Sequence, residues 1–288
     1  MLKKKKLPEN EESKQEAVEE VLEVEEKISP EIVEAPILEA EIKEIPQEVP
    51  VGVIKIKEFD KDSWKPITDL GKKVKSGEIK NIDEILDKGL KILEPEIVDI
   101  LLPDLQSDLL AIGQSKGKFG GGKRSIWRQT QKKTKEGNKP KFATLAVVGN
   151  KNGYVGIGYG KSKETVPARE KAIKQAKLNI IKIRRGCGSW ECNCGQPHSI
   201  PFKTIGKTAS IQIKLLPAPK GTGITTEKEI KKMIELAGIK DIYSKSRGQT
   251  RTKINFIFAC FKALKQLTNT KVKHDLVKQL GIVEGRLE

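Results

Sequence analysis

Apolar residues gather in two short runs in the middle of the chain, where they predict a β-hairpin. Phe142 to Val148 is a β-branched and apolar run, and Tyr154 to Tyr159 is a second one. Asn150 to Gly153 lies between them and has the residue types of a tight turn. We therefore expect the two runs to pair as antiparallel strands.

The spacing of apolar residues becomes helical after Lys163, which predicts a helix with two different faces. The apolar face holds Ala172, Ile173, Ala176 and Ile180, and another face holds Lys171, Lys174 and Lys177. We expect the apolar face to pack on the hairpin and the three ammonium groups to face outward. The chain then continues toward a further strand that ends in Arg184 and Arg185.

A second hairpin is predicted in the C-terminal half by the runs Ile200 to Thr204 and Ser210 to Leu216. A helix that Gly238 ends, a short strand around Ile242 and a last apolar helix follow. The compact part of the chain is therefore predicted to be α+β, with two small units in series.

The two segments that precede this compact part have different patterns. Within residues 51–113, Gly89, Pro95 and Pro103 punctuate short helical patterns, which we interpret as short docking helices. Residues 114–141 contain ten Lys and Arg side chains mixed with glycines and Trp127. We interpret this second segment as a basic Gly-rich insert that orders only on binding.

Charge is distributed unevenly along the 288 residues, whose formal net charge is +16 with a pI near 9.5. Residues 1–50 contain fifteen Glu, seven Lys and no Asp, a local net of −8, so the remainder carries +24. Such a basic body indicates a polyanionic partner: RNA, DNA or an anionic membrane surface. Residues 1–50 are predicted to be a disordered acidic extension, with a partner-binding peptide as the alternative.

No apolar run approaches the ~18 to 20 residues that a membrane-spanning helix needs. The basic start Met1 to Lys6 is followed by Pro8 and Glu9 instead of the apolar stretch of a signal peptide. We expect no membrane association and a cytoplasmic location.

Four potential metal ligands lie within twelve residues: Cys187, Cys192, Cys194 and His198. Three thiolates and one imidazole suit a tetrahedral zinc ion with no open position, which would make the site structural. We expect one structural zinc, and unliganded reduced thiols are the alternative. Cys260 is interpreted as a small buried apolar residue of the last helix.

Two glycine-rich segments suggest nucleotide or phosphate binding. The series that begins at Gly153 and ends at Gly160 has neither P-loop nor dinucleotide-loop spacing, so we interpret it as a tight hairpin that allows close approach of RNA backbone. Residues 217–224 with Lys220 are consistent with either a phosphate site at a helix start or helix capping alone. Because no catalytic pair of side chains stands out, we expect the chain not to be an enzyme.

Four segments together resemble the S-five family of small-subunit ribosomal proteins, which is called S-two in eukaryotes. They are Ala146 to Lys161, Ala176 to Trp190, Pro197 to Phe202 and Leu216 to Ile224. The cysteine loop resembles the archaeal type. The resemblance implies a double-stranded-RNA-binding-like domain at 142–185 and a C-terminal βαβ domain at 200–270. We expect the zinc-binding loop at 186–199 to connect them and a tail to follow at 271–288. The acidic extension and the basic insert exceed the family core.

The resemblance also implies binding to small-subunit ribosomal RNA, near the channel where messenger RNA enters. The neighbours it implies are proteins S-three, S-four and S-eight, and the role it implies is in translational accuracy and messenger unwinding. No homo-oligomer is expected, and a free zinc-containing nucleic-acid-binding regulator is the alternative function. The candidate RNA-binding residues are Lys123, Arg124, Arg128, Asn150, Lys151, Asn152, Gly153, Lys161, Lys163, Lys171, Lys174, Lys177, Arg184, Arg185 and Lys220.

Overall fold

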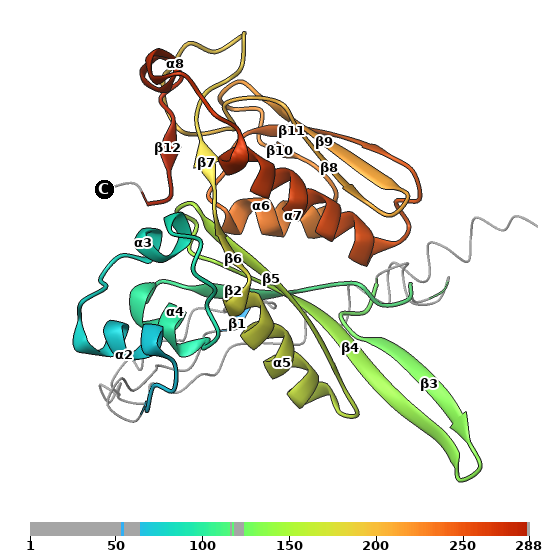
Figure 1. Cartoon of the computed structure of the whole chain (residues 1–288). Coiled ribbons are helices and arrows are strands. Elements are labelled where there is room, and N and C mark those ends of the chain that lie inside the picture. The colour runs from blue at the N-terminus through green and yellow to red at the C-terminus, as the bar shows by residue number, and fades with distance from the viewer. Residues whose placement is uncertain (1–52, 55–63, 116, 118–123, 287–288) are drawn as a thin grey trace, which may run out of the picture. The chain divides into compact units, whose positions relative to one another are not determined.

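The first sheet is antiparallel throughout, with the strand order β1-β2-β4-β5-β6 and with β3 paired to β4. The computed structural model describes residues 53–54, 64–115, 117 and 124–286 (Figure 1). The acidic extension and Lys123 lie outside the described residues. The strands are β1 Val53–Ile54, β2 Gln106–Leu110, β3 Arg128–Thr134, β4 Gly137–Gly149, β5 Tyr154–Ser162 and β6 Ile180–Lys182.

The predicted hairpin is confirmed, because β4 and β5 pair from Phe142 with Ser162 to Gly149 with Val155. Strand β2 was not expected; it pairs with β4 on the side away from β5. Ile180 belongs to β6, although we expected it on the helix before that strand.

Helix α5, Thr165–Leu178, covers one face of this sheet by packing closely on the glycines of β5 (Figure 1). A Cβ added at Gly156 would lie 2.2 Å from the carbonyl oxygen of Ala176, and one at Gly158 would lie 2.1 Å from that of Ala172. These glycines therefore allow α5 to pack closely on β5. Our expectation that they allow close approach of RNA backbone was wrong.

Three short helices share the core on this face of the sheet. They are α2 Asp69–Ser76, α3 Ile82–Asp87 and α4 Glu96–Leu101. The glycine and prolines of residues 51–113 predicted α3 and α4, whereas α2 was not expected. Ile85 and Ile97 are fully buried in the cluster that also contains Ala146 and Val148 of β4. Because neighbouring side chains of a strand point to opposite faces, Leu145 and Val147 lie in the second core.

The second sheet has the order β10-β11-β9-β8. Its strands are β8 Thr204–Thr208, β9 Ile211–Pro217, β10 Ile224–Thr225 and β11 Ile242–Arg247. Helix α6, Lys228–Leu236, connects the parallel strands β10 and β11, which gives the expected βαβ unit, and α7, Lys253–Asn269, follows. The second hairpin was expected to begin at Ile200, but its first strand begins at Thr204.

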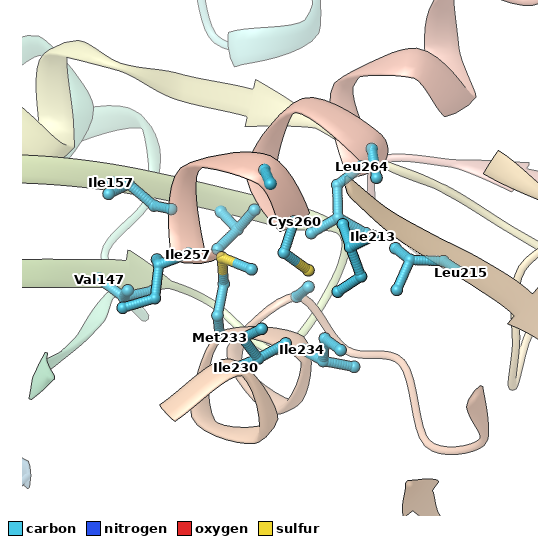
Figure 2. Close-up of a cluster of buried hydrophobic side chains, with 14 of the residues drawn as sticks. Val147, Ile157, Ile213, Leu215, Ile230, Met233, Ile234, Ile257, Cys260 and Leu264 are labelled. Atoms are coloured by element: carbon cyan, nitrogen blue, oxygen red, sulfur yellow. The ribbon is translucent and has the colours of Figure 1, made fainter. Parts of the chain in front are cut away.

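The two units share one core instead of standing independently in series. Val147 and Ile157 of the first sheet belong to the same buried cluster as Met233 of α6 and Ile257 of α7 (Figure 2). Cys260 lies in this cluster, where burial raises the pKa of its thiol, as expected for an apolar position. All described residues belong to one compact unit.

Residues 271–286 fold back onto the body, although we expected a simple tail. Helix α8, His274–Gln279, is followed by β12, Val283–Glu284, which pairs with β7, Arg184–Arg185. None of the helices in the described part of the chain is long and apolar enough to cross a bilayer.

The predicted basic insert also has regular structure in its second half. Strand β3 pairs with the first part of β4 from Arg128 with Ala143 to Thr134 with Gly137. Nearly all of these paired residues are exposed up to Lys141, and the hairpin extends beyond the rest of the sheet (Figure 1). The expected boundary at residue 142 therefore falls inside a strand.

Candidate metal centre and nucleic-acid interface

The ligand atoms of Cys187, Cys192, Cys194 and His198 all lie within 4.8 Å of one another. The loop that carries them is closed by two backbone hydrogen bonds, from Gly186 N–H to the carbonyl of Ser199 at 3.0 Å and from Ser199 N–H to that of Gly186 at 3.1 Å. A tetrahedral site with metal–sulfur bonds of ~2.3 Å holds its sulfur atoms about 3.8 Å apart. The four residues therefore fit a zinc ion after small side-chain movements.

Asp241 fixes the orientation of the histidine in this cluster. Its Oδ2 lies 2.8 Å from Nδ1 of His198, and both side chains are 6% exposed. A proton on Nδ1 that is donated to this carboxylate leaves the lone pair of Nε2 free, and Nε2 lies 3.8 Å from Sγ of Cys192. This is the outer carboxylate that commonly accompanies a metal-bound imidazole.

Two of the thiols have opposite pKa shifts. Hydrogen bonds lower the pKa of Cys192 to about 6, with the largest effect from the backbone N–H of Lys220. Burial raises the pKa of Cys187 to about 11, and its neighbours Cys194 and Cys192 add to this shift. One thiolate is thus available near neutral pH, whereas Cys187 needs a nearby cation to lose its proton.

The loop at residues 217–224 is occupied by contacts within the protein. The backbone N–H groups of Gly221 and Gly223 donate to Oδ1 of Asp241 at 3.1 and 2.8 Å. Helix α6 begins only at Lys228, after β10, so this loop is not a helix start. The loop therefore neither offers these two amides to a phosphate nor caps a helix, contrary to both alternatives that its sequence suggested. The exposed Lys220 donates from Nζ to Gln196 at 3.2 Å.

Exposed cations lie on two neighbouring elements of the first unit. Lys171 and Lys174 are exposed on α5, and Lys161 and Lys163 are exposed at and just beyond the end of β5. None of these four lysines has an ion pair within the described part of the chain. The exposed cations of the β3–β4 hairpin are Arg128, Lys132, Lys133, Lys135, Lys139 and Lys141.

Lys177 does not face outward as expected. Its side chain is 8% exposed and its Nζ lies 2.7 Å from the carboxylate of Asp99, which is 13% exposed. Burial raises the pKa of Asp99, and the ion pair with Lys177 opposes that shift. This pair connects α4 to α5 instead of offering a charge to a partner.

Arg184 and Arg185 are also buried, with exposed fractions of 9% and 3%. Arg184 forms an ion pair with Glu284 and donates to the carbonyl of Thr270 at 2.6 Å. Arg185 donates to Oδ1 of Asn152 at 2.8 Å and to the carbonyl of Gly285 at 2.9 Å. Because the folded-back C-terminal residues use both guanidinium groups, we exclude them from the candidate interface.

The hairpin turn Asn150 to Gly153 is packed against the end of α6. The backbone N–H of Lys151 donates to the carbonyl of Leu236 at 2.9 Å, and that of Gly153 to Ala237 at 3.1 Å. Oδ1 of Asn150 accepts from the N–H of Asn152 at 2.8 Å. In this turn only the side chain of Lys151 is exposed, so Lys151 alone among its residues stays in the candidate interface.

Comparison with known proteins agrees with this architecture. Residues 126–184 match the family Ribosomal protein S5, N-terminal domain, and residues 206–278 match Ribosomal protein S5, C-terminal domain. The first match includes the whole β3–β4 hairpin, which corrects our expectation that this segment exceeds the family core.

The most similar relatives that we compared are archaeal. Small ribosomal subunit protein uS5 of Nanoarchaeum equitans is 52% identical over 226 residues, covering 78% of this chain and 97% of the relative. The protein of the same name from Methanocaldococcus jannaschii is 50% identical over 229 residues, covering 80% and 99%. In Methanococcus maripaludis the identity is 46% over 231 residues, covering 80% and 96%. This chain therefore belongs to the ribosomal protein S5 family, which is not a family of enzymes.

Proposed function

We propose that this chain is a structural constituent of the small ribosomal subunit in the cytoplasm and that it binds small-subunit ribosomal RNA. The observation that carries the proposal is a set of exposed cations on α5 and near the end of β5 that have no ion pair with any residue the structure describes: Lys161, Lys163, Lys171 and Lys174. Exposed lysines without counter-charges are suited to phosphate groups, whose neutralisation releases condensed counterions. The names of its archaeal relatives support the same assignment.

The exposed β3–β4 hairpin extends this cationic surface. Double-stranded RNA is bound mainly through its shape and through backbone phosphates, so a hairpin and a helix that each present cations suit a folded RNA. The antiparallel strands β2, β4 and β5 follow α4 and precede α5, with β3 inserted between β2 and β4, and this arrangement supports the proposed likeness of the first unit to a double-stranded-RNA-binding domain.

The finer placement rests on the family resemblance. We propose a position near the channel where messenger RNA enters, beside proteins S-three, S-four and S-eight, with a role in translational accuracy and in unwinding messenger structure. The cationic hairpin supports a contact with RNA there.

Fractionation of a cell extract on a sucrose gradient tests the assignment. We expect the chain to migrate with the small subunit and to stay there through a high-salt wash, because a structural constituent is held by many phosphate contacts. A chain found only in the free fractions would refute this proposal and favour a free zinc-containing nucleic-acid-binding regulator.

We also propose that Cys187, Cys192, Cys194 and His198 hold one structural zinc ion. The mutual approach of the four ligand atoms supports this, as does the carboxylate behind His198. Metal analysis of the chain purified under reducing conditions should find one zinc per protein, and Cys192→Ser should lose it. Protein without zinc under these conditions would leave reduced thiols as the correct interpretation.

A further inference from the structure

A cavity of about 420 Å³ lies where the first residues of β3, the segment 112–114 and the start of α7 meet. Gly113 permits this meeting, because a Cβ there would lie 2.3 Å from the carbonyl oxygen of Trp127. The residues that line the cavity include Arg124, Arg128 and Arg251, together with Lys253, which is already paired with Glu227. Among the described residues that line it, none is an Asp or a Glu. The site was not apparent from the sequence, because Arg251 lies far from the other two arginines along the chain.

The three guanidinium groups have no counter-charge. None of them has an ion pair or a side-chain hydrogen bond with another residue in the part of the chain that the structure describes. The nearby carboxylates are already engaged, since Glu227 accepts from Lys253 at 2.6 Å and Glu229 accepts from the N–H of Ala111 at 2.7 Å. Three like charges around one cavity repel one another, so an anion between them is stabilised.

The remaining lining indicates what kind of anion fits. Ile112 and Ile254 supply apolar surface, whereas Gln114, Gln129 and Asn255 supply amide groups that can donate and accept hydrogen bonds. A bare phosphate, only a few times the ~30 Å³ of a water molecule, would leave most of the volume empty. The volume lies within the range that is typical of sites for a small organic molecule, and the mostly polar and cationic lining favours one that carries a phosphate.

We propose that this cavity binds one nucleotide of an RNA strand, with its phosphate on the three guanidinium groups and its base among the amide groups and the two isoleucines. Arginine suits this role because its planar group forms paired hydrogen bonds with phosphate oxygens. The inference rests on the proposed RNA binding and adds a specific pocket to it.

Two matched variants of the full chain test the inference. Arg251→Gln removes one charge from the cavity, and Arg247→Gln removes another exposed charge, from β11, that does not line it. Binding of a 12-nucleotide single-stranded RNA is measured over a range of salt concentrations. We expect Arg251→Gln to weaken binding about tenfold at low salt and to reduce the salt slope by about 0.7, the value for one lost phosphate contact. Arg247→Gln should change the affinity less than twofold.

Equal losses in the two variants would overturn the pocket while leaving general RNA binding intact. Adenosine 5′-monophosphate is the probe for a free nucleotide, and binding of this compound at least as tight as that of the 12-nucleotide RNA would also contradict the inference. If the unaltered chain binds neither the 12-nucleotide RNA nor a 16-base-pair duplex, the proposed function itself fails. Matching melting temperatures of the two variants exclude unfolding as the cause of a difference.

Discussion

Asp241 lies 43 residues after His198 and connects it to the loop at Gly221 and Gly223, because its carboxylate accepts hydrogen bonds from both. Asp241→Asn keeps the size of the side chain and removes the charge that stabilises the Nδ1–H tautomer. We expect zinc affinity to fall roughly 10- to 100-fold, as is typical for loss of an outer partner of a metal ligand. Competition with a chromophoric chelator measures this change.

Asp275→Asn is a suitable control for this prediction, since Asp275 is an exposed residue of α8 outside the cluster. It should leave zinc affinity unchanged. Equal affinities of Asp241→Asn and the unaltered chain would show that the carboxylate does not orient the imidazole.

Lys177 and Asp99 form a buried ion pair, so removal of the lysine leaves a carboxylate without its partner. We expect Lys177→Met to lower the free energy of unfolding by about 3 kcal/mol near neutral pH. This loss of unfolding free energy should become smaller as the pH falls, because burial raises the pKa of Asp99 and a protonated carboxyl group needs no counter-charge. Urea titrations at several pH values measure the effect.

The exposed Lys174 provides the comparison, and Lys174→Met should change the free energy of unfolding by at most ~0.5 kcal/mol. Similar values for the two variants would contradict the structural role that we assign to Lys177. The sequence pattern placed both lysines on one polar face, because helical spacing does not reveal an acidic partner 78 residues earlier in the chain.

We expect substitutions in the β3–β4 hairpin to weaken RNA binding with little effect on folding, because the paired residues of this hairpin are nearly all exposed. Changing Lys132 and Lys133 to Gln removes two charges from it. The slope of RNA affinity against salt should then fall by about 1.8 for a duplex, with an unchanged melting temperature. Changing the exposed Lys273 and Lys278 to Gln is the matched control. A slope that does not differ from the control would exclude the hairpin from the interface.

For Arg184 of strand β7 we expect the opposite result, because its guanidinium group forms an ion pair with Glu284 and donates to the carbonyl of Thr270. Arg184→Ala should lower the free energy of unfolding by roughly 2 kcal/mol, since it removes the ion pair with Glu284 and the charged hydrogen bond to Thr270. The salt slope of RNA binding should stay unchanged. A shallower slope at unchanged stability would restore Arg184 to the interface, and the exposed Arg247→Ala serves as the control for stability.

The elements that the sequence predicted well are those that local pattern defines. The β4–β5 hairpin, α5 and the short helices around Ile85 and Ile97 follow from turn residues, glycines, prolines and apolar spacing. Strand β12 was not predicted, because its two residues are too few to show an alternation of apolar and polar positions. Its pairing with Arg184 and Arg185 also spans about 100 residues of sequence. The four metal ligands were predicted because they are close in sequence, whereas Asp241 was not.

In the described part of the chain, successive side chains of β4 point to opposite faces of the sheet. Strand β4 therefore contributes to two cores and joins two units that the sequence suggested were in series. Val147 faces the core of α6 and α7, and Val148 faces the core of α5 and the short helices. The apolar faces of α5 and β5 pack against each other, and the lysines on the opposite side of α5 and at the end of β5 lie at the surface. Sequence reasoning found the basic charge of the body, but burial and pairing decide which of its cations are available to a partner.

A map of the assembled small subunit at side-chain resolution tests the central claim most directly, which is that these exposed cations neutralise ribosomal RNA. We predict phosphate oxygens within about 4 Å, the limit for an ion pair, of the ammonium groups of Lys161, Lys163, Lys171 and Lys174. Lys177 and Arg184 should keep their partners within the chain. If the four lysines face open solvent with no phosphate in reach, the RNA-binding role proposed for this surface is wrong.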